Sequence, residues 1–328
     1  MDEGTLDELV EMLSGVQNVA QRDGAAEVVA QLSGSDGGTE LLLRRAAPLC
    51  RRLLGLASGS VGDGPGSSAA AHAAAALVNL TGTEAGADAA ADAGAVSVAV
   101  ELLAAHPSGA LDERCCQLLA NVSATDKGAM AVLQSHNEKL HGLHLTRLVG
   151  LLLGGGAAAT SPPAAYDSLA AVLVNVTRHE LGRELVAGPT KGLVAPLSAQ
   201  LEDVEGPPAR RLGAAQVLRN LSLAEASRSE AVEAGGKDML RALLVPVGST
   251  RPREESAELR LACAEAVRAF AADDKGRELL WAVGGPVELQ KGYEVEDDEA
   301  VNEAMEATAQ VFIQNNLQPG DAGDLEAE

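Results

Sequence analysis

Aromatic residues are scarce in this chain. Phe, Tyr and Trp together make up 2% of its 328 residues, and only one tryptophan is present. Hydrophobic residues still reach 46%, a share typical of folded proteins. Because Ala, Leu and Val must then build the core, each layer buries little apolar area per residue. We therefore expect the stability to be spread along the chain instead of residing in one large core.

Residues that carry catalysis or bind metals are equally sparse. The four cysteines form no CxxC motif, and the neighbours Cys115 and Cys116 cannot form an ordinary disulfide with each other. The histidines His136, His141 and His144 form one cluster, but their spacing matches no standard zinc site. No nucleophile, base and acid fall into a recognisable arrangement. We predict a protein that is not an enzyme and that has no catalytic residues, no metal site and no cofactor.

Positive charge is in short supply as well. The chain has 25 Lys and Arg against 47 Asp and Glu, so its formal net charge is −22. A polyanion repels phosphate backbones, and we expect no nucleic-acid partner. After Lys291 there are eleven acidic residues and no Lys or Arg. We interpret this run as a solvated helix face followed by an acidic, disordered tail at residues 316–328; the alternative is a docking site for a basic partner.

No apolar run is long enough to span a membrane, and the acidic start carries no apolar signal segment. We expect no membrane partner and a location in the cytoplasm, with the nucleus as an alternative, where thiols stay reduced. This location bears on four Asn-x-Ser/Thr sequences, at Asn79, Asn121, Asn175 and Asn220, which would otherwise predict N-glycosylation. We interpret them as repeat residues that happen to match the glycosylation motif.

These asparagines mark an internal repeat. The sequence Ala-Leu-Val-Asn-Leu-Thr at 76–81 recurs in related form at 118–123, 172–177 and 217–222, and the asparagines are 42, 54 and 45 residues apart. Such a period indicates a HEAT or armadillo solenoid. Residues 5–56 are predicted to be an atypical first repeat, Ala269 takes the asparagine place in a fifth motif, and a helix at 300–315 closes the array.

Each unit contains a short helix, a Leu-rich helix and a third helix that ends at the asparagine. We therefore predict an all-α fold, an armadillo/HEAT-like right-handed superhelical solenoid of about six three-helix repeats, with one array over residues 1–315.

The asparagines are also the candidate binding residues. A buried asparagine would satisfy its amide on neighbouring backbone, whereas an asparagine that lines the concave groove would offer a donor and an acceptor to an extended peptide. Both interpretations stay open. Residues four and seven positions before each asparagine share its helical face. The predicted protein-binding groove is small, polar and mildly basic, and it comprises Asn79, Asn121, Asn175, Asn220, His72, Arg114, Gln117, Ser168, Gln216 and Arg219.

The order of the units resembles a known family. A degenerate first repeat precedes four Asn units, and the Gly-Arg-Glu-Leu sequence at 182–185 returns at 276–279 within a fifth unit that lacks the asparagine; an acidic helix follows. This order resembles the eukaryotic Hgh-one family, cytosolic armadillo proteins that act as folding adaptors for translation elongation factor two. The resemblance implies binding of the newly made factor and its delivery to the cytosolic chaperonin. We further expect a monomer.

Two rival functions fit the same architecture. A nuclear-import adaptor needs Trp four residues before each asparagine, to stack on the lysine stems of a basic signal. Those positions hold Ala75, Gln117, Ala171 and Gln216, which argues against this rival. A generic armadillo scaffold that binds another protein or an extended peptide in its groove remains the alternative.

Overall fold

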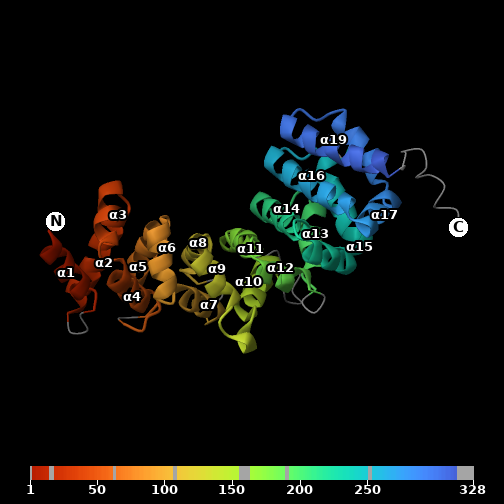
Figure 1. Cartoon of the computed structure of the whole chain (residues 1–328). Coiled ribbons are helices and arrows are strands. Elements are labelled where there is room, and N and C mark those ends of the chain that lie inside the picture. Colours follow the sequence, from red (N-terminus) through yellow and green to blue (C-terminus); the bar gives the residue numbers. More distant parts are fainter. Residues whose placement is uncertain are drawn as a thin grey trace. The chain divides into compact units, whose positions relative to one another are not determined.

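The computed structural model describes residues 2–14, 18–61, 64–105, 109–154, 163–188, 192–249 and 253–315. These ranges contain helices and turns and no strand (Figure 1). The predicted tail at 316–328 lies outside them. The chain divides into two compact units, Met1–Val176 and Thr177–Glu328. The all-helical repeat fold predicted from the asparagine period is confirmed.

The first unit is a stack of short helices. They are α1 (Glu3–Met12), α2 (Val19–Ser33), α3 (Asp36–Leu43), α4 (Ala46–Ala57), α5 (Ser68–Thr81), α6 (Glu84–Asp92), α7 (Ala95–Ala105), α8 (Asp112–Ser123), α9 (Asp126–Leu133), α10 (Leu143–Leu153) and α11 (Leu169–Thr177), with 3-10 turns at Glu138–Leu140 and Ala164–Tyr166. Helices α2, α5 and α8 pack side by side as the third helices of successive repeats (Figure 1).

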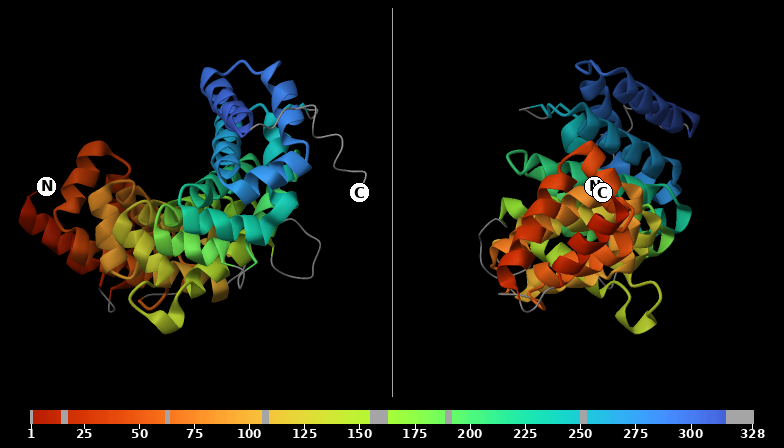
Figure 2. Two further views of the ribbon diagram at one scale, coloured as in Figure 1. Left: turned by 45° about the vertical axis from the view of Figure 1, so that its right-hand side comes forward. Right: turned by 90° about the vertical axis from the view of Figure 1, so that its left-hand side faces the viewer.

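The second unit is also built from three-helix repeats. Its helices are α12 (Glu180–Ala187), α13 (Val194–Glu202), α14 (Pro208–Ser222), α15 (Glu225–Val247), α16 (Ala257–Ala272), α17 (Asp274–Ala282), α18 (Gly285–Tyr293) and α19 (Glu299–Gln314). Helix α15 supplies two helices of its repeat, because Gly236 at φ 51° bends it in the middle. Helices α14, α16 and α19 lie side by side as third helices, green through blue in Figure 2.

One predicted grouping is wrong. Residues 5–56 were expected to form one atypical repeat, but that range contains the end of one repeat and the beginning of another. Helix α2 ends at Ser33 in the place of an Asn helix, whereas α3 and α4 precede α5 as the first and second helices of its repeat. The reason is that the polar turn at Gly34 and Ser35 ends a third helix, as the turns after α5 and α8 do.

Alanine makes the close packing of these helices possible. On α5, five alanines are almost completely buried: Ala69, Ala70, Ala73, Ala74 and Ala76. Leu77 and Leu80 of the same helix are completely buried and supply most of its apolar area. Small side chains let neighbouring backbones approach, and the leucines fill the spaces that remain. The expected core of Ala, Leu and Val is therefore present.

Each asparagine helix is followed by a tight turn into the next short helix. The turn residue caps that helix: Thr125 accepts a hydrogen bond from the backbone N–H of Gly128 at 3.1 Å, and Thr83 accepts one from Gly86 at 3.2 Å. The glycine is required by a close approach, because a methyl group at Gly128 would lie 1.8 Å from the carbonyl oxygen of Val122. At the matching place in α15, Ser227 donates its hydroxyl to the Leu221 carbonyl at 2.7 Å.

Arginines bind the backbone carbonyls at the ends of α11, α14 and α16. The Nη1 atom of Arg183 donates to the carbonyl of Arg178 at 2.8 Å, and Arg228 donates to Ser222 at 2.9 Å. Arg277 donates to the carbonyl of Ala271 at 3.1 Å. Carbonyls at a helix C-terminus have no partner within the helix and carry partial negative charge, so a guanidinium stabilises them. This role explains why Gly-Arg-Glu-Leu occurs twice in the sequence.

A buried ion pair ties the start of α16 to the turn before α19. Arg260 holds Glu296 with two hydrogen bonds, of 2.9 and 2.8 Å, and the two side chains are 5% and 2% exposed. Arg253 and the backbone N–H of Asp298 add hydrogen bonds of 2.8 and 2.9 Å. Burial alone would raise the pKa of Glu296, but the hydrogen bonds outweigh burial and lower this pKa to about 2.

The close approach at Gly128 predicts a steric penalty. Gly128→Ala should lower the free energy of unfolding by about 1–3 kcal/mol, because the new methyl group must push α9 away from the end of α8. Gly150→Ala is the matched control, since Gly150 lies inside α10 with open space around it. The control should be neutral or stabilising by about 1 kcal/mol. Urea unfolding measures both, and equal effects of the two substitutions would contradict the packing described here.

The Arg260–Glu296 pair predicts a dependence of stability on pH. The pKa of Glu296 is lower in the folded chain, about 2, than its ordinary value of 4.5. Its stabilisation is therefore fully present above pH 4.5 and is lost as the pH falls toward 2. Glu296→Gln should lower the free energy of unfolding at pH 7 by on the order of 3 kcal/mol. The difference from wild type should shrink below pH 4.5, and the exposed control Glu303→Gln should show neither effect.

Candidate protein-binding surface

Each repeated asparagine is hydrogen-bonded to the preceding repeat. Asn121 of α8 donates its Nδ2 to the Val78 carbonyl at 3.0 Å and to the Thr81 hydroxyl at 3.3 Å, both at the end of α5. Thr81 in turn donates that hydroxyl to the carbonyl of Leu77 at 2.7 Å. The hydroxyl therefore accepts from one helix and donates to another, and it connects the two repeats.

The same contact recurs at the other three asparagines. In the first unit, Asn79 donates to the Ser33 hydroxyl at 3.1 Å, and Asn175 donates to the Ser123 hydroxyl at 3.1 Å. In the second unit, Asn220 donates to the Thr177 hydroxyl at 3.0 Å. The accepting hydroxyl always lies two residues after the asparagine position of the preceding repeat. This position explains three of the four Asn-x-Ser/Thr sequences, those that contain Thr81, Ser123 and Thr177.

Exposure separates the four asparagines. Asn79 is exposed, Asn121 and Asn175 are half-buried, and Asn220 is 8% exposed. In the first three residues the Nδ2 donor is used, whereas the Oδ1 acceptor receives no hydrogen bond from any described residue, and each of these side chains is at least partly exposed. The two interpretations of the asparagine thus apply to different atoms. The nitrogen serves the fold, and the oxygen remains available to a ligand N–H.

The predicted groove residues that precede Asn121 on α8, Arg114 and Gln117, carry hydrogen-bonding groups. Arg114 donates to Gln117 Oε1 at 3.2 Å, and Gln117 donates to Glu113 Oε1 at 3.1 Å. Arg114 is exposed and Gln117 is half-buried. His72 on α5 and Ser168 before α11 are half-buried, and the His72 Nδ1 atom has no partner among the described residues. In the first unit, the predicted residues therefore lie on the third helices and their approaches.

The predicted groove residues of the second unit, Gln216 and Arg219, do not form a basic surface. The Arg219 side chain pairs with Glu265 of α16 at 2.5 Å, and Gln216 donates to Glu258 at 2.8 Å. The expectation of a mildly basic groove is wrong here, because α16 brings carboxylates that offset the charge of Arg219. The partners are more than forty residues apart in the sequence, so the sequence alone did not predict that they pair. What remains is a polar surface with mixed charge.

A polar cleft adjoins Asn79. It has a volume of about 540 Å³, and its lining includes hydroxyl groups from the end of α2, from α3 and from the turn after α5. The lining residues are Ser33, Gly34, Ser35, Thr39, Glu40, Leu43, Asn79, Gly82 and Thr83. A cleft with many short hydroxyl groups and one exposed carboxamide suits hydrogen bonding to peptide backbone.

The cysteines carry no nucleophilic chemistry. All four are free and buried. Burial raises the pKa of Cys50 to about 11, and burial together with the charge of Asp112 raises the pKa of Cys115 to about 12. Neither thiol is ionised at neutral pH, and a thiol is a poor nucleophile. Within the described ranges, no cluster of three or more His, Cys, Asp or Glu side chains is arranged to hold a metal ion.

Sequence reasoning missed the second half of each contact. The accepting hydroxyls at Thr81, Ser123 and Thr177 were treated only as part of a false glycosylation motif, and Ser33 was given no role. A glycine seven residues after Asn79, Asn121 and Asn175, at Gly86, Gly128 and Gly182, also went unnoticed; after Asn220 this position holds Ser227. The signal was present as an extended repeat, Asn-x-Ser/Thr followed by a capping residue and the glycine. It would have predicted both the bond and the tight turn.

The bond between repeats predicts a coupled loss of stability. Asn121→Ala should lower the free energy of unfolding by about 1–2 kcal/mol, because the Val78 carbonyl and the Thr81 hydroxyl lose their donor. Thr81→Val removes the same acceptor from the other side. In a double-mutant cycle, the two losses should couple by about 0.5–1 kcal/mol. Thr308→Val is the control, since that hydroxyl donates to the Ala304 carbonyl of its own helix at 2.8 Å; additive losses for Asn121 and Thr81 would contradict the contact.

Comparison with solved structures supports the fold. An engineered protein has a TM-score of 0.66 at 20% identity, covering 95% of this chain and 78% of its own. A computationally designed armadillo repeat protein for modular peptide recognition scores 0.59 at 19% identity, covering 80% of this chain and 99% of its own. A designed armadillo repeat protein in complex with the peptide (KR)4 scores 0.59 at 17% identity, covering 81% and 99%. These likenesses show an armadillo-like fold.

Two further comparisons concern the sequence and its helices. No curated protein matches the chain. Within the described ranges, every helix is too short or too polar to cross a membrane.

The family described as "Domain of unknown function (DUF383)" matches residues 103–278, which is more than half of the chain. The match spans the repeats that contain Asn121, Asn175 and Asn220, and the chain belongs to this DUF383 family.

Proposed function

We propose that this chain is a non-enzymatic protein-binding adaptor that uses the surface of its third helices. One observation carries the proposal: the amides of Asn79, Asn121 and Asn175 use their nitrogen within the fold, whereas their oxygen receives no hydrogen bond from any described residue. A row of fixed acceptors suits the N–H groups of an extended peptide. The peptide recognition named for the designed armadillo neighbours supports this mode of binding.

The partner is proposed from the order of the repeats. A degenerate first repeat, four Asn repeats, a fifth without asparagine and an acidic last helix resemble the folding adaptors of translation elongation factor two. We propose that the chain acts as a monomer in the cytoplasm or nucleus, binds the newly made factor and brings it to the cytosolic chaperonin. The net charge of −22 favours a protein partner over a nucleic acid.

An import-type adaptor is less well supported. The positions four residues before the asparagines hold Ala75, Gln117, Ala171 and Gln216, none of which offers a face for a lysine stem. Gln216 is also held by Glu258. A scaffold for another protein partner is the remaining alternative, since it would use the same acceptors.

Affinity capture from a eukaryotic lysate tests the proposal. The wild-type chain at native expression level should enrich elongation factor two and the cytosolic chaperonin. Arg114→Ala with Gln117→Ala should reduce this capture about tenfold while leaving the thermal unfolding midpoint unchanged, because neither side chain bonds to another repeat. His136→Ala with Lys139→Ala removes exposed side chains from the loop before α10, and it should leave the capture unchanged.

The outcomes separate the partner from the surface. If elongation factor two is absent from the captured proteins, the folding-adaptor role is wrong. If a different protein dominates and is lost with the Arg114 and Gln117 substitutions, the binding surface stands and its partner is another protein. If both pairs of substitutions reduce capture equally, the surface of α8 is not the binding site.

A further inference from the structure

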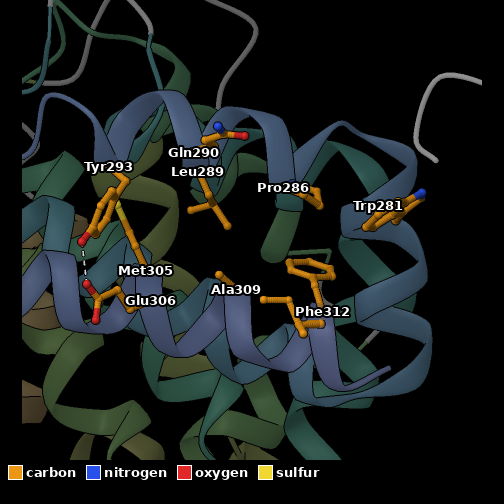
Figure 3. A pocket seen from close by; sticks show the side chains of 10 residues that line it. Trp281, Pro286, Leu289, Gln290, Tyr293, Met305, Glu306, Ala309 and Phe312 are labelled. Carbon is orange, nitrogen blue, oxygen red and sulfur yellow. Dashed lines mark hydrogen bonds between the residues drawn. The ribbon is translucent and has the colours of Figure 1, made fainter. Parts of the chain in front are cut away.

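An apolar pocket lies between α18 and α19, in the second unit. Its volume is about 280 Å³. Figure 3 shows that Pro286, Leu289 and Gln290 line it from α18, that Ala309 and Phe312 line it from α19, and that Trp281 closes one end. No asparagine of the repeat contributes to it. The pocket therefore shares no residue with the acceptors on α5, α8 and α11.

The composition of this pocket is unusual for the chain. The sequence has five aromatic residues, and three of them, Trp281, Tyr293 and Phe312, line the pocket together with Met305. The rings of Trp281 and Phe312 are 5.9 Å apart and tilted by 54°. Aromatic residues and methionine are enriched at the centres of protein interfaces, where they supply most of the binding energy. Such a concentration indicates a recognition pocket.

Part of the lining faces solvent. Tyr293 is 42% exposed and Ile313 is 58% exposed, whereas Trp281, Met305 and Phe312 are nearly buried. The pocket thus has a rigid apolar floor and accessible walls. A cavity of about 150 Å³ can hold benzene, so 280 Å³ can hold one bulky side chain with part of its neighbour.

One carboxylate lines the pocket, and more acidic residues lie close to it in the sequence. Glu306 lines it and accepts a hydrogen bond from the Tyr293 hydroxyl at 2.5 Å (Figure 3). Glu294, Glu299 and Glu303 lie nearby in the sequence and are exposed. The last cation before this region, Lys291, is paired with Glu288 at 2.9 Å. The field around the opening therefore attracts cations and repels anions.

We propose that this pocket docks a bulky apolar side chain from a basic segment of a partner protein. The apolar floor binds the side chain, and Glu306, together with the exposed carboxylates that neighbour it in the sequence, attracts the flanking Lys or Arg. The chain's own end fits poorly, because residues 316–328 contain four acidic residues and no basic one. A second copy also fits poorly, since each copy carries a net charge of −22. The proposal does not depend on the function assigned to the asparagines.

The sole tryptophan reports directly on the pocket. A synthetic peptide Lys-Lys-Phe-Leu-Lys-Lys, titrated into the full-length chain, should change the emission of Trp281 saturably, with micromolar affinity that weakens as salt is added. A matched peptide with Ala in place of Phe and Leu should bind about tenfold more weakly. A peptide with Glu in place of every Lys should bind more weakly still, because Glu306 and the acidic residues near it in the sequence repel it.

Two substitutions with the same change in charge locate the binding. Ala309→Glu places a carboxylate in the pocket and should weaken the Phe-Leu peptide about tenfold. Gln310→Glu adds the same charge on the adjacent exposed residue, which does not line the pocket, and should retain or strengthen binding. Both residues are exposed on α19, and a circular dichroism melt checks that both variants fold.

Four results would overturn the proposal. The first is no saturable change in Trp281 emission. The second is equal binding of the Phe-Leu and Ala peptides, which would indicate charge attraction alone. The third concerns the double variant Leu317→Ser with Leu325→Ser, measured without peptide. If its Trp281 emission differs from that of the wild type, residues 316–328 occupy the pocket. The fourth is a dimer in sedimentation that Ala309→Glu dissociates, which would assign the pocket to a second copy.

Discussion

The amide-to-hydroxyl hydrogen bond between successive repeats constrains the rest of this structure. A helix end leaves its last carbonyls without partners. At Thr81 and Ser123 the hydroxyl returns a bond to its own helix and accepts another from the next asparagine. Layers of alanine bury little apolar area and offer few protruding side chains that interlock. A third helix could therefore shift along its neighbour and still bury a similar area. The directional hydrogen bond at the end of each asparagine helix fixes one of these positions.

This arrangement changes after Asn220. The fifth motif has Ala269 in the place of the asparagine, so Ser222 of the preceding repeat has no amide donor facing it. Ala271 stands in the place of the hydroxyl, so the fifth motif also offers no acceptor to the repeat that follows it. Phe270 is completely buried between them, and the pair Arg260–Glu296 supplies the directional contact instead. Four of the five aromatic residues lie at or after Phe270. A second ion pair, Arg211–Glu254, is also almost buried, at 8% and 9% exposure. The last repeats thus combine aromatic burial with two shielded ion pairs, whereas the earlier repeats have the repeated amides.

The repeat and its helix ends could be predicted from the sequence because Asn121 and its counterparts are local signals within one period. The bond partners could not be predicted with equal ease. Thr81 lies 40 residues before Asn121, and the three-residue motif that contains it also matches a glycosylation site. Arg219 and Glu265 are likewise far apart, and their pairing changed the expected charge of the surface. Apolar residues such as Leu289 and Phe312 look like core residues one at a time, and only the packing of α18 on α19 leaves space between them.

The use of each amide also limits what can bind the first unit. Because Nδ2 of Asn79, Asn121 and Asn175 is already donated within the fold, the free group on each is an acceptor. A carboxylate or phosphate ligand has no donor for it and would also meet a strongly negative chain. An extended backbone has an N–H at nearly every residue and is recognised without regard to side chains. Under the proposed function, selectivity would come from neighbouring side chains such as Arg114 and Gln117.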